Sequence, residues 1–358
     1  MIMKILQILE PIGMGGVEKI ASDLHNYISN CDNVESYIAM SKDYIDIFKE
    51  SYEMKDLKNI LPIDNSSIIK RIKSYRSIIE QIDPDIIHTH ARKECVLTCI
   101  LKSDKYHIRT QHMEEYNRIP KIFIEKYIIK KKVDKWICTS NTLKNNYLLN
   151  QGINDLKCDV IYNGIENNIT DIDKNYYEIN KSKLKLGFIG RLNHQKGLDI
   201  LIDDISSLDK RILDNLELTV LGDGEDKAEL IKKVNKYNMN DVIKFLGFRK
   251  NVIDIINKFD ILVMPSRNEG LPLVLLESMS TGTPVAIHDV GCISEIIENG
   301  KNGWIIDRSN NSWSNFIKDL FYGKYNVSEI SKKSYETYKT KFTLERMCKE
   351  YYEVYKKA

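Results

Sequence analysis

The sequence has almost no excess of charge of either sign. Its 358 residues include 53 Lys and Arg against 51 Asp and Glu, a formal net charge of +2. A dedicated nucleic-acid binder normally carries a strongly basic domain, because it must neutralise phosphates. We therefore expect no nucleic-acid partner. The length exceeds the size at which one hydrophobic core keeps growing, so two domains are expected.

Long apolar runs and paired cysteines are missing as well. No stretch is apolar for long enough to span a membrane, and the apolar start of the chain stops at Glu10 and Pro11, too early for a signal sequence. The 7 cysteines are odd in number and lack the two-residue spacings of a zinc site. We expect reduced thiols, no bound metal and a cytoplasmic location.

What the sequence does contain is an alternation of short apolar runs with helical patterns. Such runs are typical of buried parallel strands. They are predicted at 3–9, 86–88, 108–110, 136–139, 159–162, 184–190, 216–222, 243–246, 261–265 and 284–288. The alternation predicts an α/β fold with two doubly wound, Rossmann-like parallel sheets and helices on both faces of each.

The composition shifts between Asn163 and Lys183, where polar residues and a Tyr-Tyr pair separate the two series of strands. We expect the first domain to cover 1–165 and the second 166–342, each large enough for its own sheet. The segment 343–358 carries apolar residues at helical spacing and is predicted as a terminal helix that docks on a folded part of the chain.

Glycines follow the first predicted strand. Gly13, Gly15 and Gly16 precede a predicted helix over 17–28. Glycine lets the backbone approach a ligand closely, and a helix N-terminus offers unpaired N–H groups to an anion. A tight turn that needs glycine for its dihedral angles is an equally good interpretation. A nicotinamide-binding fingerprint is excluded, because the third glycine and the acidic end of the next strand are missing.

The second series of strands begins with a comparable turn. Strand 184–190 is followed by Arg191 and Lys196, and a helix is predicted from Leu198. An arginine and a lysine at the carboxyl end of a strand, beside glycine and a helix start, can bind a diphosphate from two sides. A surface charge pair is the alternative. The position favours phosphate binding, because open α/β sheets bind ligands there.

The sharpest signal is a pair of glutamates, Glu269 and Glu277. Glu269 follows strand 261–265 on a Gly/Pro turn, and Glu277 lies just over one turn inside the helix that Pro272 begins. The two carboxylates are then separated by on the order of 10 Å. This suits a ligand with a hydroxyl-rich group at one end, a ribose at the other, and phosphates between them on the helix N-terminus. A purely structural pair is the alternative.

Three histidines and an arginine lie near the ends of two strands of the first half. We expect His88 and His90 to point to opposite faces of their strand, so that only His90 faces a cleft. For each, a buried and hydrogen-bonded core role is the alternative. Arg109 and His112 end the next strand, where contact with an acceptor and a place at the cleft rim are both open.

One stretch of the first half is basic. Residues 92–144 hold 13 Lys and Arg against 6 Asp and Glu. Within it, 118–135 interleaves basic and large apolar residues, as an amphipathic helix on an anionic membrane would. A core helix with a solvated basic face is the alternative.

These motifs, in their order, resemble the retaining GT-B glycosyltransferases, in particular the nucleotide-sugar-dependent bacterial family 4. The resemblance covers essentially the whole chain. It is carried by Gly15-Gly16-Val17-Glu18, His88-Thr89-His90, Tyr162-Asn163-Gly164-Ile165, Gly190-Arg191-Leu192 with Lys196-Gly197, Gly222-Asp223-Gly224, and Glu269 with Glu277. It implies two domains that face a central cleft, with the terminal helix packing back on the first domain.

The resemblance also implies roles for single residues. Arg191 and Lys196 would hold the donor diphosphate, Glu277 the ribose, and Glu269 the donor-sugar hydroxyls and positive charge at the anomeric carbon. Backbone N–H groups at Gly15, Gly16, Gly270, Leu271 and Leu273 would complete the donor site. Phe248 and Arg249 would lie in the segment that flanks the nucleobase. His90 would face the donor sugar from the first domain.

The expected activity is transfer of a sugar, with retention, from a nucleotide-sugar donor, most simply a UDP-sugar, to a surface-glycan or lipid-linked acceptor. Acceptor contacts are expected from His88, Arg109 and His112. Positive groups at the phosphates make a metal or cofactor unnecessary, and the resemblance favours peripheral contact with the inner face of the cytoplasmic membrane. A GT-B-fold UDP-sugar epimerase and a non-catalytic nucleotide-binding scaffold are the alternatives.

Overall fold

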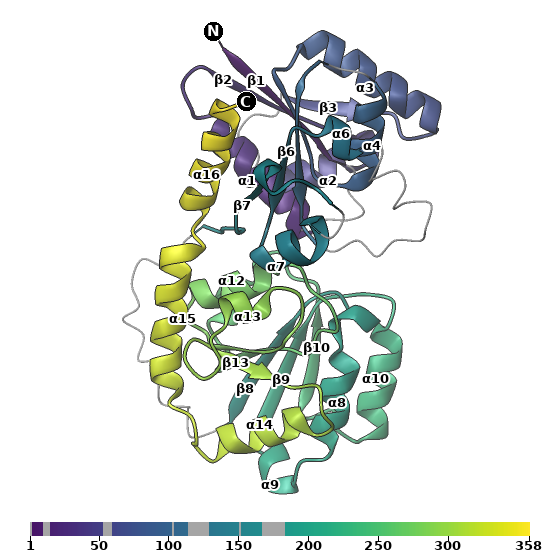
Figure 1. Ribbon diagram of the computed structural model, residues 1–358. Coiled ribbons are helices and arrows are strands. Elements are labelled where there is room, and N and C mark those ends of the chain that lie inside the picture. The colour runs from purple at the N-terminus through teal and green to yellow at the C-terminus, as the bar shows by residue number, and fades with distance from the viewer. Residues whose placement is uncertain are drawn as a thin grey trace. The chain divides into compact units, whose positions relative to one another are not determined.

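A computed structural model of the chain describes residues 2–9, 15–52, 59–101, 104–113, 129–149, 152–166 and 183–358 (Figure 1). The chain divides into two compact units. Unit 1 comprises 1–164 and 344–358, and unit 2 comprises 165–343. Each is built around its own parallel sheet.

Unit 1 holds a seven-stranded sheet with the strand order β3-β2-β1-β4-β5-β6-β7. Its strands are β1 (Met3–Leu9), β2 (Val34–Ser41), β3 (Ile60–Ile63), β4 (Ile86–Thr89), β5 (Tyr106–Gln111), β6 (Lys135–Cys138) and β7 (Cys158–Val160). Its helices are α1 (Gly16–Ile28), α2 (Ile45–Ser51), α3 (Ile68–Ile82), α4 (Arg92–Ile100), α6 (Lys130–Lys132), α7 (Asn141–Leu143) and α16 (Leu344–Lys356).

Helices cover both faces of this sheet because alternate residues of each strand point to opposite sides. Leu6 and Ile8 of β1 pack with α3 and α4, whereas Leu9 packs with α1 and α2. The terminal helix α16 lies against α1. Its buried Met347, Cys348, Tyr351 and Tyr355 recur at helical spacing, which is why this segment forms a helix with one apolar face.

Unit 2 holds a six-stranded sheet with the strand order β10-β9-β8-β11-β12-β13. Its strands are β8 (Leu184–Ile189), β9 (Leu216–Leu221), β10 (Ile243–Gly247), β11 (Ile261–Met264), β12 (Val285–His288) and β13 (Trp304–Ile306). Its helices are α8 (Leu198–Ser206), α9 (Lys210–Leu213), α10 (Lys227–Lys236), α11 (Ile253–Ile256), α12 (Leu273–Ser280), α13 (Ile293–Ile296), α14 (Ser312–Phe321) and α15 (Val327–Lys341).

In unit 2, α8 contacts α10 and α14 (Figure 1). On the other side, α12 contacts α11 and α15. Between α8, α14 and the sheet, the buried core includes Phe188, Trp304, Trp313 and Phe316. All strand pairs in both sheets are parallel. The predicted class, α/β with two doubly wound parallel sheets, is confirmed.

Three strands were not predicted, namely β2, β3 and β13. β3 and β13 are edge strands of four and three residues. Pro62 lies within β3, where the missing backbone donor can be tolerated because the strand has a free edge. Short edge strands bury less apolar surface, so their sequences carry a weaker strand signal than the central strands do.

Candidate active site

Each sheet reverses its strand order beside its first strand, between β1 and β4 in unit 1 and between β8 and β11 in unit 2. In open parallel sheets, ligands bind at the carboxyl ends of the strands that flank such a reversal. The loops that follow these four strands carry several of the residues predicted from the sequence, among them His90, Arg191, Lys196 and Glu269.

The centre of the unit 2 site is an ion pair. Lys196 follows β8 in a short 3₁₀ turn (His194–Lys196), and Glu269 lies in the loop after β11. Lys196 Nζ lies 2.6 Å from Glu269 Oε1, which also accepts a hydrogen bond of 2.7 Å from the Ser266 hydroxyl. Glu269 is 7% exposed. The charge of Lys196 is therefore already balanced by a buried carboxylate.

Backbone and side-chain hydrogen bonds join the two loops that carry this pair. The Arg267 N–H donates to the Gln195 carbonyl at 2.8 Å, and the Gln195 amide donates to the Asn268 carbonyl at 2.9 Å. Arg267 Nη1 donates to the His194 carbonyl at 2.7 Å. The relative position of Lys196 and Glu269 is thus fixed by contacts between their neighbours as well as by their own ion pair.

Arg267 is itself held by α8. Its guanidinium forms two hydrogen bonds of 2.7 Å with the carboxylate of Asp199 in the first turn of that helix. Burial raises the pKa of Asp199, but the bonds to Arg267 outweigh it and leave that pKa below its ordinary value. Neither residue stands out in the sequence. An acidic residue in a first helical turn and an arginine in a loop are too common to indicate a pair.

Two glycines allow the loops to pack this closely. Gly197 has φ +70°, and a Cβ there would lie 2.1 Å from the carbonyl oxygen of Pro265. Gly291, in the loop after β12, has φ +60°, and its Cβ would lie 2.1 Å from the carbonyl oxygen of Glu269. A side chain at either position would push the Glu269 loop away. Gly291 was missed in the sequence, where it has no neighbouring glycine to mark it.

The other predicted donor-binding residues of unit 2 surround this pair. Arg191 follows β8 directly and is exposed, with its Nε 3.5 Å from an oxygen of the equally exposed Glu225. Such a surface ion pair contributes little and leaves the arginine free to turn to a ligand. The loop after β10 carries Phe248, which is 65% exposed, and Arg249, whose Nη1 donates to the Phe248 carbonyl at 3.4 Å.

The helix α12 begins directly after the Glu269 loop. Gly270 and the buried Leu271 lead to Pro272, which precedes the first helical residue, Leu273. The Leu275 N–H donates to the Pro272 carbonyl at 3.2 Å, but the proline ring offers no side-chain acceptor to the N–H groups before it, which can bind an anion. Glu277 is half-buried one turn further along. The structure places it on a helix, as predicted.

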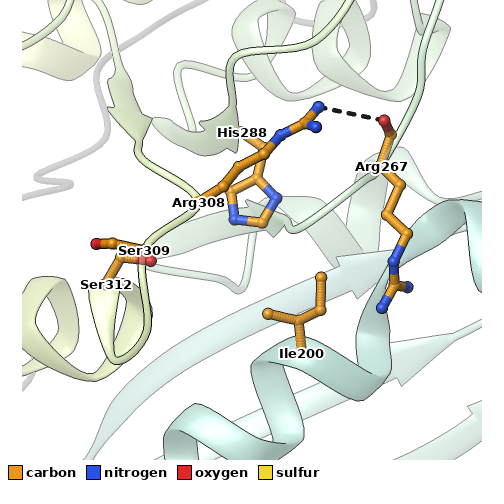
Figure 2. A pocket seen from close by; sticks show the side chains of 6 residues that line it. All are labelled: Ile200, Arg267, His288, Arg308, Ser309 and Ser312. Carbon is orange, nitrogen blue, oxygen red and sulfur yellow. Dashed lines mark hydrogen bonds between the residues drawn. The ribbon is translucent and has the colours of Figure 1, made fainter.

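Figure 2 shows a pocket of about 270 Å³ beside the Glu269 loop. Its lining residues are Ile200, Arg267, His288, Arg308, Ser309 and Ser312. Arg308 Nη2 donates to the Arg267 carbonyl at 3.2 Å. The indole of Trp313 donates to His288 Nε2 at 2.8 Å. None of the side chains predicted to bind a donor lines this pocket, so it is not assigned to the donor site.

In unit 1, three polar side chains form a chain of hydrogen bonds across neighbouring strands. His90 Nε2 lies 3.1 Å from Gln7 Oε1, and His90 Nδ1 lies 3.1 Å from His112 Nε2. The Gln7 amide nitrogen donates to the Ala21 carbonyl at 3.2 Å, so its oxygen must accept from His90. His90 Nδ1 then accepts from His112, and Nδ1 of the half-buried His112 is left as an acceptor.

His88 points to the same face as His90, and the prediction of opposite faces was wrong. Residues two apart in a strand share a face, and the two ring centroids lie 4.2 Å apart. His88 has no exposed surface. Its Nδ1 lies 2.7 Å from the Tyr355 hydroxyl and its Nε2 2.7 Å from the Thr110 hydroxyl. It therefore joins α16 to the sheet.

Burial keeps these imidazoles neutral. It lowers the pKa of His88 to about 3 and that of His112 to about 4, and it lowers the pKa of His90 as well. Neighbouring histidines and, for His112, the charge of Arg109 act in the same direction. At neutral pH the group offers hydrogen bonds without charge.

Arg109 lies on the opposite face of β5 and has no exposed surface. Its Nη2 donates to Gln111 Oε1 at 2.7 Å, and its guanidinium stacks over the Trp136 ring, 5.0 Å from the ring centroid. An arginine so placed is part of the interior of unit 1 rather than of its rim.

At the start of α1, the Gly15 N–H donates to Glu18 Oε2 at 3.1 Å, and the Gly15 carbonyl accepts from the Tyr52 hydroxyl at 3.0 Å. Burial raises the pKa of Glu18. The structure thus brings a carboxylate to the turn where a phosphate contact is predicted at Gly15 and Gly16. Gly13 lies outside the described residues.

Most of the basic segment predicted at 118–135 lies outside the described residues, which resume at Ile129. From there, Lys130–Lys132 form the short helix α6 between the buried Ile129 and Val133. None of the helices in the described part of the chain combines the length and apolar character needed to cross a membrane.

Two family models match the chain, one to each half. The model for glycosyl transferases group 1 matches residues 170–335, and that for glycosyltransferase family 4 matches residues 14–168. An uncharacterized glycosyltransferase of Methanocaldococcus jannaschii is 30% identical over 303 residues, which cover 79% of this chain and 80% of that protein.

Two further proteins are similar. The UDP-Gal:alpha-D-GlcNAc-diphosphoundecaprenol alpha-1,3-galactosyltransferase of Escherichia coli is 28% identical over 284 residues, 72% of this chain and 71% of that protein. Among solved structures, Anabaena HepE in complex with UDP-glucose matches with a TM-score of 0.84 at 18% identity, over 99% of this chain and 100% of that one. At that identity the structural match supports the fold alone.

Proposed function

The chain belongs to the glycosyltransferases of family 4, group 1, with the GT-B fold, and from that premise we propose that it transfers a hexosyl group with retention from a UDP-sugar. The acceptor in this proposal is a growing surface glycan or a lipid-linked sugar. The E. coli relative supports this proposal, because its name gives a UDP-galactose donor and a diphosphoundecaprenol-linked acceptor. The structural neighbour, which binds UDP-glucose, supports the choice of donor.

The observation that carries the proposal is the Lys196–Glu269 pair. Cleavage of a glycosyl–phosphate bond leaves positive charge on the anomeric carbon and negative charge on the departing diphosphate. Lys196 and Glu269 lie 2.6 Å apart at the carboxyl ends of β8 and β11. A cation and a carboxylate this close together could face the negative and the positive centre at the same time, because one bond joins those centres. Lys196 would bind the phosphates, and Glu269 the sugar hydroxyls and the anomeric charge.

The remaining residues of unit 2 would hold the rest of the donor. In the proposal, Arg191 turns from Glu225 to the diphosphate, and N–H groups at the start of α12, around Gly270, Leu271 and Leu273, bind phosphate oxygens. Glu277 accepts from the ribose hydroxyls. The exposed Phe248 and Arg249 flank the nucleobase. No metal ion or cofactor takes part.

Unit 1 would bind hydroxyl groups. His90 is proposed to face the donor sugar, and the free acceptor nitrogen of His112 to accept from a sugar hydroxyl of donor or acceptor. Gly16 remains a candidate for a phosphate contact, whereas the Gly15 N–H would have to leave Glu18 first. His88 and Arg109, which are buried, would act on an acceptor only through His90, His112 and Gln111.

We place the reaction at the inner face of the cytoplasmic membrane, because a lipid-linked acceptor would be presented there and 118–135 is basic and apolar in sequence. Flotation of the protein with anionic and with neutral liposomes at low salt tests this part alone. Flotation with anionic liposomes only would support it, and recovery in the soluble fraction with both would contradict it.

The activity itself is tested by incubating the protein with UDP-, GDP- and ADP-sugars, with and without glycan acceptors, and following nucleotide release. The proposal expects release from a UDP-sugar with retention of configuration, stimulated by an acceptor. Release of an epimer without acceptor would indicate an epimerase, and nucleotide binding without turnover would indicate a scaffold. Lys244→Met, which changes an exposed lysine far from the pair in sequence, serves as control for Lys196→Met.

A further inference from the structure

A group of two thiols and an imidazole lies on the α4 side of the unit 1 sheet. Cys95 and Cys99 are one helical turn apart on α4, and His107 lies on β5. Their three ligand atoms lie within 4.8 Å of one another, and all three side chains are at least nine-tenths buried. The spacing of the cysteines along the chain did not reveal this group, because its third member comes from a strand.

The hydrogen bonds around His107 fix which of its nitrogens faces the thiols. Thr98 donates its hydroxyl hydrogen to the carbonyls of its own helix at 2.9 and 3.0 Å, and Thr89 donates to the Ile108 carbonyl at 3.4 Å. Both hydroxyl oxygens lie 3.2 to 3.4 Å from His107 Nε2. The ring must therefore carry its hydrogen on Nε2, and the lone pair of Nδ1 faces Cys99 Sγ at 3.5 Å.

The two thiols of the Cys95–Cys99 pair lie four residues apart, on one face of α4. Both sulfur atoms lie within 4.8 Å of a ring nitrogen of His107 on β5.

We propose that Cys95, Cys99 and His107 bind one Zn(II) ion. A tetrahedral zinc ion with sulfur at about 2.3 Å and nitrogen at about 2.0 Å places these two atoms about 3.5 Å apart. That is the distance observed between Cys99 Sγ and His107 Nδ1. Within the described residues the group comprises three ligands, and the fourth position is assigned to water.

The second ring nitrogen of His107, Nε2, is hydrogen-bonded in the way that is usual for a zinc ligand. A ligating histidine normally donates its other N–H to a fixed acceptor, which orients the ring. Thr89 and Thr98 are such acceptors. By contrast, Cys138 and Cys158 lie in the same apolar cluster as the pair, and burial raises the pKa of both. They behave as small apolar residues and provide matched controls.

The bound ion would join α4 to β5, the strand that leads to His112. It would thereby stabilise the part of unit 1 that carries the proposed hydroxyl-binding group. The metal site does not depend on the proposed function, since it rests on residues that take no part in sugar transfer.

The test uses the full-length, reduced protein after removal of metal with a chelator. Co(II) serves as spectroscopic probe, and Zn(II) affinity is measured by competition with a coloured chelator. We expect one ion per chain, with thiolate-to-cobalt bands and the intense bands of tetrahedral cobalt. Cys99→Ser should weaken Zn(II) binding by more than about 100-fold, since even outer-shell partners contribute 10- to 100-fold. Cys158→Ser should leave it unchanged.

A variant that keeps all three ligands distinguishes a weakened metal site from a loss of folding. Thr89→Val removes one acceptor of the His107 N–H and should weaken Zn(II) binding about 10-fold, with an unchanged far-ultraviolet dichroism spectrum. Absence of tetrahedral cobalt bands in the wild-type protein would overturn the proposal. Cobalt bands that are abolished in Cys158→Ser and retained in Cys99→Ser would also overturn it. So would a disulfide between Cys95 and Cys99 that persists under the reducing conditions.

Discussion

The carboxyl ends of the two sheets carry different kinds of polar group, although the sheets share one topology. In unit 2, charged pairs lie after β8 and β11, namely Lys196 with Glu269, and Arg267 with Asp199 of α8. In unit 1, Gln7 of β1, His90 after β4 and His112 after β5 form a hydrogen-bonded chain. One site is built of full charges, and the other of neutral rings and an amide.

In the proposed function, this difference matches the two ends of a nucleotide sugar. A diphosphate requires cations and N–H groups, whereas a sugar presents hydroxyls that neutral donors and acceptors bind without the cost of burying a charge. Burial keeps the imidazoles of unit 1 neutral, and a carboxylate keeps the Lys196 charge balanced until a ligand arrives. Variants of each region should therefore fail in different ways.

The largest effect is expected in the charged region. Lys196→Met should lower kcat for nucleotide-sugar turnover by about 10²- to 10³-fold, as removal of one group that stabilises transition-state charge does elsewhere. Steady-state kinetics with the best donor measures this. Lys244→Met should retain wild-type turnover, and an equal loss in both variants would contradict a specific role for Lys196.

The second-largest effect is expected from loss of the Arg267–Asp199 ion pair. Arg267→Gln removes a charge-assisted pair worth about 1.5–3 kcal/mol, so kcat/KM should fall about 10- to 100-fold without removal of any donor-binding residue. Arg267→Lys should recover little of it, because a lysine cannot form both bonds to Asp199. Wild-type kinetics in Arg267→Gln would show that the loops keep their positions without it. Arg211→Gln on α9 is the control.

In the neutral region, the expected loss is of stability. Tyr355→Phe leaves His88 Nδ1 without its partner in the interior and should lower the free energy of unfolding by about 1–3 kcal/mol. Urea denaturation measures it, with the exposed Tyr322→Phe as control. Turnover below the unfolding temperature should stay near the wild-type value. A large loss of turnover with unchanged stability would instead place His88 in the reaction.

The smallest effect concerns pH. The folded-state pKa values of His88 and His112, about 3 and about 4, lie below the ordinary value near 6.5. Between pH 6.5 and 4 the unfolded chain binds more protons, so stability falls as pH falls. Each histidine contributes at most about 1.4 kcal/mol per pH unit. Urea midpoints at pH 7, 6 and 5 should decline less steeply in His88→Gln, and equal slopes would contradict these pKa values.

The sequence predicted most of the central strands of both sheets, because they carry apolar runs and end at turn residues. It missed β3 and β13, which are short edge strands, and also the central strand β2. In the candidate site, it pointed to Lys196 and Glu269, which the structure brings together, and to Glu277 on α12. It did not identify Arg267, Asp199 or Gln7, whose roles depend on partners far along the chain, such as the 68 residues between Asp199 and Arg267.

The error at His88 has a different cause, because residues two apart in a strand share a face and the prediction of opposite faces miscounted that period. The Tyr355 partner of His88, 267 residues away, cannot be read from the local sequence. Likewise, the buried position of Arg109 depends on Trp136, which belongs to the next strand.

The central claim, that Lys196 binds phosphate and Glu269 acts on the sugar, is tested most directly by the affinity for free UDP. Calorimetry on wild type, Lys196→Met and Glu269→Gln separates the two roles. We predict UDP binding about 10-fold weaker in Lys196→Met. In Glu269→Gln, we predict binding at least as tight as in wild type, because Lys196 is released, although turnover is lost. Weakening of UDP binding by Glu269→Gln to the same extent as by Lys196→Met would contradict the account.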